Sequence, residues 1–275
     1  MPTLTRADAR GMNLDAKELT HLFLRWIHVF AGILWVGTTY YFTWLDGRFT
    51  ELLARSQREG ENRVWMVHSG GFYVVERLRG AKVMPEPLHW FRWEAAITWL
   101  SGFLLFAFVY YHGGLMVETE DARLSPRTAM TISLVSLAVA WLVYDLLWKW
   151  IYNEFLGVAI SCGLIVATTY GLFQFFASRA ACLQLGAMLG TIMTANVWMR
   201  ILPAQKRMVA ALKEGREPDL VEALRAKTRS KHNTFIVIPV VYLMLSPHFP
   251  GTYRWTTVSL LILVGLIAAK FVRRA

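Results

Sequence analysis

Cysteine and acidic residues are both scarce in this 275-residue chain, and each scarcity limits its chemistry. The two cysteines, Cys162 and Cys182, lie in apolar stretches, and neither begins a Cys-x-x-Cys-His motif or belongs to a zinc-like pair. We therefore expect no covalent c-type haem and no structural disulfide. We expect no cleavable signal sequence either, because the first apolar stretch is too long for a signal core and no small-residue cleavage site follows it.

The shortage of acidic residues leaves 29 Lys and Arg against 19 Asp and Glu, a net charge of +10. In a soluble protein this excess would suggest nucleic acid, but here the basic residues gather in alternate loops, as the positive-inside rule requires. Gly47–Arg92 holds eight of them and Arg200–Lys231 holds nine. We therefore expect no nucleic-acid partner, and we expect the loops 47–92 and 203–231 to face the cytoplasm.

Apolar residues are abundant, because 55% of the chain is hydrophobic and it contains 12 tryptophans. A stretch of about 20 apolar residues matches the ~30 Å hydrocarbon core of a bilayer. The predicted transmembrane helices are Phe23–Trp44, Ala95–Tyr111, Ala129–Trp148, Phe155–Phe176, Ala180–Leu202, Phe235–Leu245 with its flanks, and Val258–Val272. The sequence thus predicts an all-α fold, a polytopic bundle of about seven transmembrane helices in contact with membrane lipid. We expect residues 1–275 to form a single membrane domain, with the N-terminus outside and the C-terminus inside.

Both cytoplasmic segments are longer than simple turns, and long loops of this kind are usually functional or independently folded. The first contains Ser69, Gly70 and Gly71, which would allow a ligand to approach the backbone closely. The second, from Pro203 to Lys231, alternates basic and acidic residues and favours helix. We interpret it as a solvated helical hairpin.

The seven histidines divide by their depth in this topology. His28 lies roughly two turns inside the first span, counted from its outer end with a rise of 1.5 Å per residue. Burying an imidazole there without a partner would cost free energy. A neutral imidazole in a helical bundle can bind haem iron or another transition metal, so His28 is the strongest candidate ligand. His68, His89 and His232 belong to the cytoplasmic side, and a lone histidine at such a boundary is more often a hydrogen-bonded structural residue.

A second group of polar side chains gathers where the second span begins. His89, Arg92 and Glu94 lie close together there, beside Trp90. This arrangement could bind a polar aromatic substrate or anchor the helix end with an aromatic belt, and pattern alone favours the belt. Other polar residues toward helix ends, among them Asp145 and Arg200, are explained by snorkelling or by pairing with a neighbouring charge.

Five segments of the chain together carry a resemblance to a known family. They are residues 28–46 (HVFAGILWVGTTYYFTWLD), 67–73 (VHSGGFY), 84–95 (MPEPLHWFRWEA) followed by 99–102 (WLSG), 196–206 (NVWMRILPAQK) and 229–235 (RSKHNTF). They resemble the membrane domain of bacterial cytochrome c-dependent urate oxidases. The resemblance covers nearly the whole chain, and long aromatic-rich segments in the same order are more specific than a short motif.

The resemblance implies oxidation of urate to 5-hydroxyisourate, with electrons passed to cytochrome c across a bacterial inner membrane. A haem b in the bundle would carry them from a cytoplasmic substrate to a periplasmic acceptor, and we expect His28 to be one iron ligand. His68, His89 and Glu94 are the expected catalytic residues. Arg92, Tyr73, Trp90 and His232 are expected to bind substrate, since urate is a flat anion that an arginine can orient and an aromatic ring can stack on.

The family's membrane domain is followed by a further helix and a c-type cytochrome domain, which we do not expect in this chain. A separate periplasmic cytochrome c or another respiratory electron carrier would then accept the electrons. Association into a homo-oligomer stays open. Two other functions also stay open: a haem-binding membrane oxidoreductase or maturation factor with another substrate, and a cofactor-free transporter.

Overall fold

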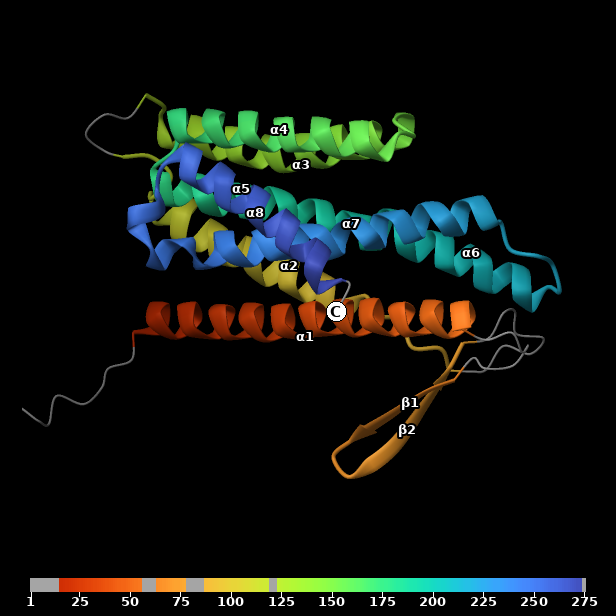
Figure 1. The fold of residues 1–275 in the computed structure, drawn as a ribbon. Helices are drawn as coiled ribbons and strands as arrows, with labels where there is room; N and C mark the ends of the chain where they lie inside the picture. Colours follow the sequence, from red (N-terminus) through yellow and green to blue (C-terminus); the bar gives the residue numbers. More distant parts are fainter. Residues whose placement is uncertain (1–14, 56–62, 78–86, 119–122, 274–275) are drawn as a thin grey trace, which may run out of the picture.

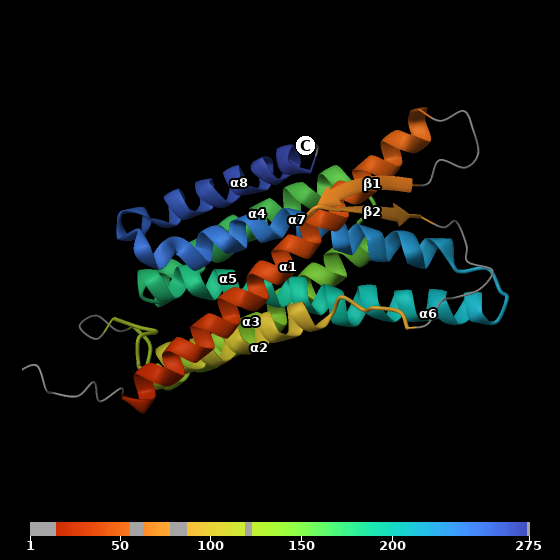
Figure 2. The same cartoon turned by 90° about the horizontal axis from the view of Figure 1, so that it is seen from below.

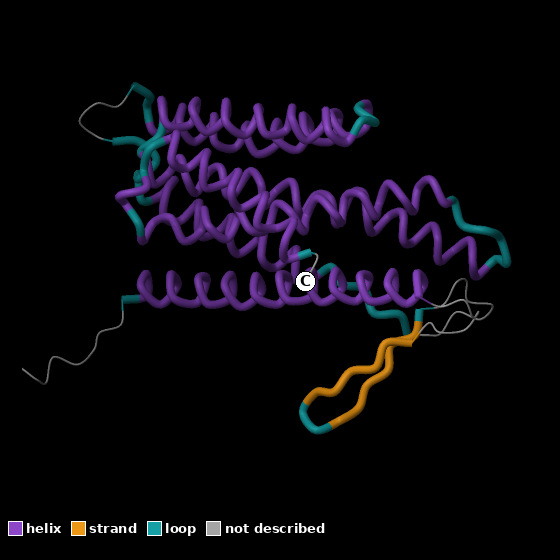
Figure 3. Tube along the Cα trace, viewed as in Figure 1, coloured by secondary structure: helices purple, strands orange, loops and turns teal. Residues whose placement is uncertain are grey.

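The computed structural model describes residues 15–55, 63–77, 87–118 and 123–273. Long helices account for most of them, and a β-hairpin follows the first helix (Figure 3). The helices are α1 (Ala16–Arg55), α2 (Trp93–Phe106), η1 (Ala107–His112), α3 (Pro126–Trp150), α4 (Glu154–Phe175), α5 (Ser178–Ala195), η2 (Asn196–Ile201), α6 (Leu202–Lys213), α7 (Leu220–Leu245), η3 (Ser246–His248), η4 (Pro250–Thr252) and α8 (Trp255–Val272). The strands are β1 (Arg63–His68) and β2 (Gly71–Glu76).

The long helices form a bundle around α5. Figure 1 shows α3 and α4 along one side and α1 along the other, with α2, α5, α7 and α8 between them. About 61% of the apolar window in Ser178–Lys213, the continuous helix that begins with α5, is buried, compared with 6% for the window in α1. The core therefore lies around α5, which packs against α2, α3, α4 and α7. The expected all-α class is confirmed.

Polar residues at three helix starts explain where those helices begin. The Ser125 hydroxyl accepts a hydrogen bond from the Thr128 amide, and Pro126 occupies the first helical position of α3. The Asn153 side chain accepts from the Leu156 amide at the start of α4. The Asp219 carboxylate accepts from two amides at the start of α7. These caps satisfy backbone donors that a helix leaves unpaired.

Six helices of the described chain are long and apolar enough to cross a membrane, as expected for a multi-pass membrane protein. They are Ala16–Ala54, Trp93–His112, Pro126–Trp150, Glu154–Phe175, Ser178–Lys213 and Trp255–Val272. α7 is not among them, because charged residues occupy its first half and its apolar half, Phe235–Leu245, is short. The count of seven spans and their orientation stay predictions.

Two π-helical turns occur among the described helices. η1 continues α2, and η2 joins α5 to α6, so that Ser178–Lys213 forms one continuous helix. A π-helical turn changes the direction of the side chains that follow it, and such turns occur often at functional sites. α6 and the first half of α7 then form an antiparallel hairpin beyond α3 and α4 (Figure 1). The expected helical hairpin between Pro203 and Lys231 is confirmed.

The first long loop contains an antiparallel β-hairpin that the sequence did not predict. Ser69 and Gly70, with φ angles of 49° and 75°, form its two-residue turn. Positive φ at both positions is typical of a type I′ turn, which matches the twist of the strands. Val64 of β1 packs against Leu45 and Phe49 of α1, so one face of the hairpin rests on the first helix.

Candidate functional site

A cavity of about 630 Å³ lies between α1, the chain entering α2, the η2–α6 segment and α7. Its aromatic walls are Trp35, Phe42, Trp90 and Phe91. Its hydroxyl groups come from Thr38, Thr39, Thr43, Ser230 and Thr234. Its charged groups are Asp46, Glu94, Lys227, Lys231 and Arg273. The cavity therefore offers flat apolar surface, hydrogen-bonding oxygens and charges of both signs, a combination typical of a small-molecule site.

The threonines of α1 face the cavity mainly as acceptors. Thr38, Thr39 and Thr43 each donate a hydrogen bond to the backbone carbonyl one turn earlier, at 2.9, 2.7 and 2.8 Å. Because a hydroxyl has one donor and two lone pairs, each oxygen can still accept a hydrogen bond. The Tyr40 hydroxyl donates to the Thr234 carbonyl at 3.2 Å and holds α1 against α7. This wall suits a ligand that carries several N–H groups.

Three of the sequence-predicted site residues, His89, Trp90 and Glu94, line this cavity together. His89 is exposed and its ring meets the edge of Phe91, with centroids 4.5 Å apart. Glu94 is half-buried in the first turn of α2. The approach to α2 thus brings an imidazole, an indole and a carboxylate to one ligand-sized space. Residues 84–86 of the same motif lie outside the described residues.

Other sequence-predicted residues lie outside the cavity wall. Arg92 stacks its guanidinium over Trp93 and Trp198, 5.4 and 5.9 Å from the ring centroids. His68 and Tyr73 are exposed on the β-hairpin. His232 packs its ring on Trp148, with centroids 4.1 Å apart. These four residues do not join His89, Trp90 and Glu94 at the cavity.

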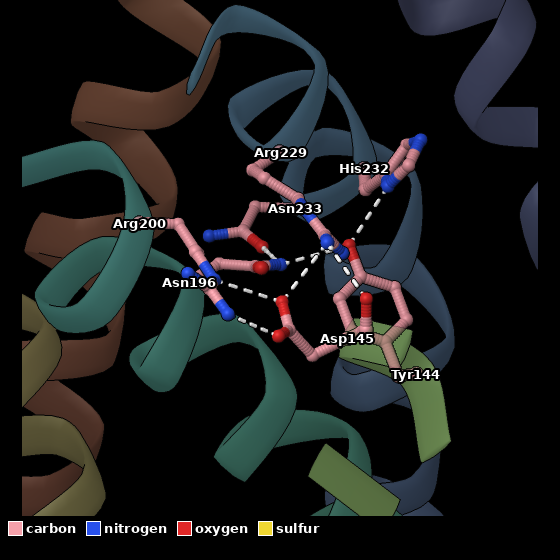
Figure 4. Close-up of polar contacts among 7 residues, drawn as sticks. All are labelled: Tyr144, Asp145, Asn196, Arg200, Arg229, His232 and Asn233. Atoms are coloured by element: carbon pink, nitrogen blue, oxygen red, sulfur yellow. Dashed lines mark hydrogen bonds and ion pairs between the residues drawn. The ribbon is translucent and has the colours of Figure 1, made fainter. Parts of the chain in front are cut away.

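Behind the cavity wall, a buried polar network connects α3, η2 and α7 (Figure 4). Asn233, which also lines the cavity, accepts a hydrogen bond of 2.9 Å from Asn196 and donates one to the Met193 carbonyl. Asn196 also donates to the Tyr144 hydroxyl at 3.0 Å, and that hydroxyl lies 2.7 Å from His232 Nδ1. The network fixes the cavity wall to the bundle core.

The same network contains a buried carboxylate held by two arginines. Arg200 approaches Asp145 through two of its nitrogens, and Arg229 Nη2 donates to Asp145 Oδ1 at 2.9 Å and to its backbone carbonyl at 3.1 Å. Asp145 and Arg229 are each only 7% exposed. The expected pairing of Asp145 with a neighbouring charge is confirmed. The π-helical turn η2 carries both Asn196 and Arg200 into this network.

Sequence reasoning missed two parts of this site. The α1 threonines, at positions 38, 39 and 43, were not considered, although hydroxyls at this spacing within an apolar helix are a usable signal. The two-arginine environment of Asp145 was also missed, because Arg200 and Arg229 come from segments distant in the chain. Asp145 itself, a lone carboxylate among apolar residues, was the available signal.

His28 lies at the contact between α1 and α2. Its Nδ1 is 2.9 Å from the Thr98 carbonyl, which indicates that Nδ1 carries the proton and leaves Nε2 as the atom that could bind iron. A Cβ at Gly102 would lie 2.7 Å from His28 Cε1, so only glycine leaves room for this ring. No group of three or more His, Cys, Asp or Glu side chains that could hold a metal ion occurs within the described ranges.

Gly102→Ala tests how tightly the α1–α2 contact is packed. The new methyl group would overlap the His28 ring, which its hydrogen bond holds in place, and overpacking of this kind costs about 1–3 kcal/mol. We expect a lower Tm in detergent. Gly37→Ala is the matched control, because a Cβ there meets no atom within 4 Å. Equal Tm values for the two variants would contradict the tight contact.

The apolar helices, the cavity and the polar network behind it define a polytopic membrane-type helical protein with a ligand-sized site beside the α6–α7 hairpin. Comparison with known families matches residues 15–275 to the family described as Urate oxidase N-terminal. The chain belongs to this family, and the resemblance found in the sequence is confirmed. No curated protein and no solved structure matches the chain.

Proposed function

We propose that this protein is a membrane urate oxidase that converts urate to 5-hydroxyisourate in the cavity between α1, α2, α6 and α7. The proposal rests on the family match and on the chemistry of the residues that line the cavity. Urate is a flat anion with several N–H groups. The cavity offers indole rings for stacking, threonine oxygens for N–H donors and lysines for the negative charge.

The proposed reaction removes two electrons and two protons from urate and then adds one water molecule. Trp90 stacks on the ring, and Lys227, whose contact with Asp46 is long at 3.9 Å, neutralises the urate charge. Lys231 already pairs with Glu154. Glu94 accepts a ring proton, and His89 is the second candidate for this role. Because His68, Tyr73, Arg92 and His232 lie off the cavity wall, we assign them no direct contact with urate in this proposal.

The proposed placement is a bacterial inner membrane, with seven spans, the N-terminus outside and the C-terminus inside. The basic residues of the loops 47–92 and 203–231 support this orientation. The cavity then opens on the cytoplasmic side, where purines occur, and the electron acceptor is a separate periplasmic cytochrome c or another respiratory carrier. Haem b, when bound, supplies a one-electron carrier between the two sides, and His28 Nε2 is the proposed ligand atom.

The test is anaerobic addition of urate to the purified protein while its visible spectrum is recorded. We expect a Soret band that shifts on reduction by urate, and we expect it to be lost or altered in His28→Ala. A Soret band that does not respond to urate would favour an oxidoreductase or maturation factor with another substrate. Colourless, correctly inserted protein from porphyrin-supplied cells would reject haem and favour the transporter.

A further inference from the structure

The β1–β2 hairpin has apolar side chains on both faces, although within the described part of the chain only one face packs on protein. The inner face contacts α1 through Val64, Met66 and Val75. The opposite face, here called the outer hairpin face, carries the charged pair Arg63–Glu76 at its base and, beyond it, the apolar cross-strand pairs Trp65–Val74 and Val67–Phe72. These four apolar side chains are 69, 42, 69 and 81% exposed in that order. A sheet face in contact with water normally carries polar residues, so this face requires an apolar environment.

The height of the hairpin along α1 indicates what that environment is. Val64 packs against Leu45 and Phe49, and further along β1 the Tyr41 hydroxyl contacts Met66 Sδ at 3.7 Å. β1 therefore runs back toward the middle of α1, as Figures 1 and 2 both show. Tyr41 belongs to the apolar stretch Phe23–Trp44. The turn and the outer hairpin face thus lie level with the part of α1 that the proposed placement puts in the bilayer.

The polar groups of the hairpin limit how deeply it can enter. Both edges of a two-stranded sheet carry unpaired backbone groups, which the hydrocarbon core does not tolerate. At the base of the hairpin, Arg63 pairs with Glu76 at 3.4 Å and Arg77 with Asp46 at 3.6 Å, and all four side chains are partly solvated. The base therefore stays in water while the outer face meets the acyl boundary, where tryptophan is preferred.

We infer that the hairpin is a second membrane anchor, with its outer face seated at the headgroup–acyl boundary of the cytoplasmic leaflet. Trp65, Val67, Phe72 and Val74 contact the first segments of the acyl chains. The occupant of this face is lipid rather than a second protein, because lipid covers any surface at this height that protein leaves open. The inference rests on the bilayer placement in the proposed function and is independent of urate chemistry.

An environment-sensitive fluorophore attached at Phe72→Cys tests this inference. The background is Cys162→Ala, in which the remaining cysteine, Cys182, is fully buried. The labelled protein is placed in nanodiscs of phosphatidylcholine and phosphatidylglycerol, with lipids that carry a nitroxide near the headgroup or deep in the acyl chain. Two matched labels serve as controls: Ile33→Cys in the apolar part of α1 and Arg225→Cys in the charged half of α7.

We expect the Phe72 label to emit at shorter wavelength than the Arg225 label and to lose emission with the shallow nitroxide. The Ile33 label should respond more to the deep nitroxide. A Phe72 label that behaves like the Arg225 label would overturn the inference while the placement of α1 stands. Protection of the Phe72 label from both lipid and aqueous quenchers, with cross-linking between copies, would overturn it in favour of a protein interface. An Ile33 label that lipid does not quench would reject the bilayer placement itself.

Discussion

Asp145→Asn is expected to destabilise the bundle by about 3–5 kcal/mol, the usual cost of leaving a buried charge without its counter-charge. The carboxylate balances Arg200 and Arg229, and it is their common partner in the network of Figure 4. Arg200 is half-exposed and can turn to solvent, but Arg229 is only 7% exposed and cannot. The measurement is the Tm and the recovery of monodisperse protein in detergent.

Two further variants separate this charge effect from a general loss of packing. Asp46→Asn removes a carboxylate whose contacts with Arg77 and Lys227, at 3.6 and 3.9 Å, are largely exposed, so its Tm should change little. Adding Arg229→Met to Asp145→Asn removes the unpaired charge and should recover part of the lost stability. Wild-type Tm for Asp145→Asn alone would show that the buried pair does not stabilise the fold.

Glu94→Gln is expected to lower kcat for urate oxidation by about 10²- to 10⁴-fold, the range for loss of a positioned proton acceptor. The substitution keeps the shape and polarity of the side chain at the cavity wall but removes its basic oxygen. KM should change much less, because stacking on Trp90 and the charges of α7 remain. Steady-state turnover with an artificial one-electron acceptor measures both constants.

The control for this prediction is Glu76→Gln, which makes the same change on the β-hairpin, outside the cavity. It should leave kcat and KM unchanged. His89→Ala, measured in parallel, separates the two proposed proton acceptors. Full turnover in Glu94→Gln together with loss of turnover in His89→Ala would transfer the role to the imidazole.

Part of this fold could be predicted because the apolar helices depend mainly on composition. Stretches such as Ala129–Trp148 and Phe155–Phe176 match α3 and α4 closely, since a long apolar run has few other stable structures. The β-hairpin could not be recognised in the same way. Its strands are apolar on both faces, so the alternation of polar and apolar residues that marks a half-buried strand is missing.

The candidate site could be predicted only where its residues share one segment. His89, Trp90 and Glu94 lie within six consecutive residues, and they meet at one cavity. The rest of its wall comes from α1, η2, α6 and α7, whose arrangement depends on long-range packing. The π-helical turn η2 also lies among tertiary contacts, because its Asn196 and Arg200 form hydrogen bonds with residues of α3 and α7. No local pattern in residues 196–201 indicates it.

The unequal burial of the helices has a consequence for how the chain is assembled during synthesis. α1 is translated before the other described helices and only 6% of its apolar window is buried, so packing on those helices is not needed for it to enter a bilayer. α7 emerges late and carries Arg229 and Asn233, whose partners Asp145 and Asn196 are translated before it. The buried position of α7 therefore depends on α3 and on the α5–η2 segment, both of which are translated before it.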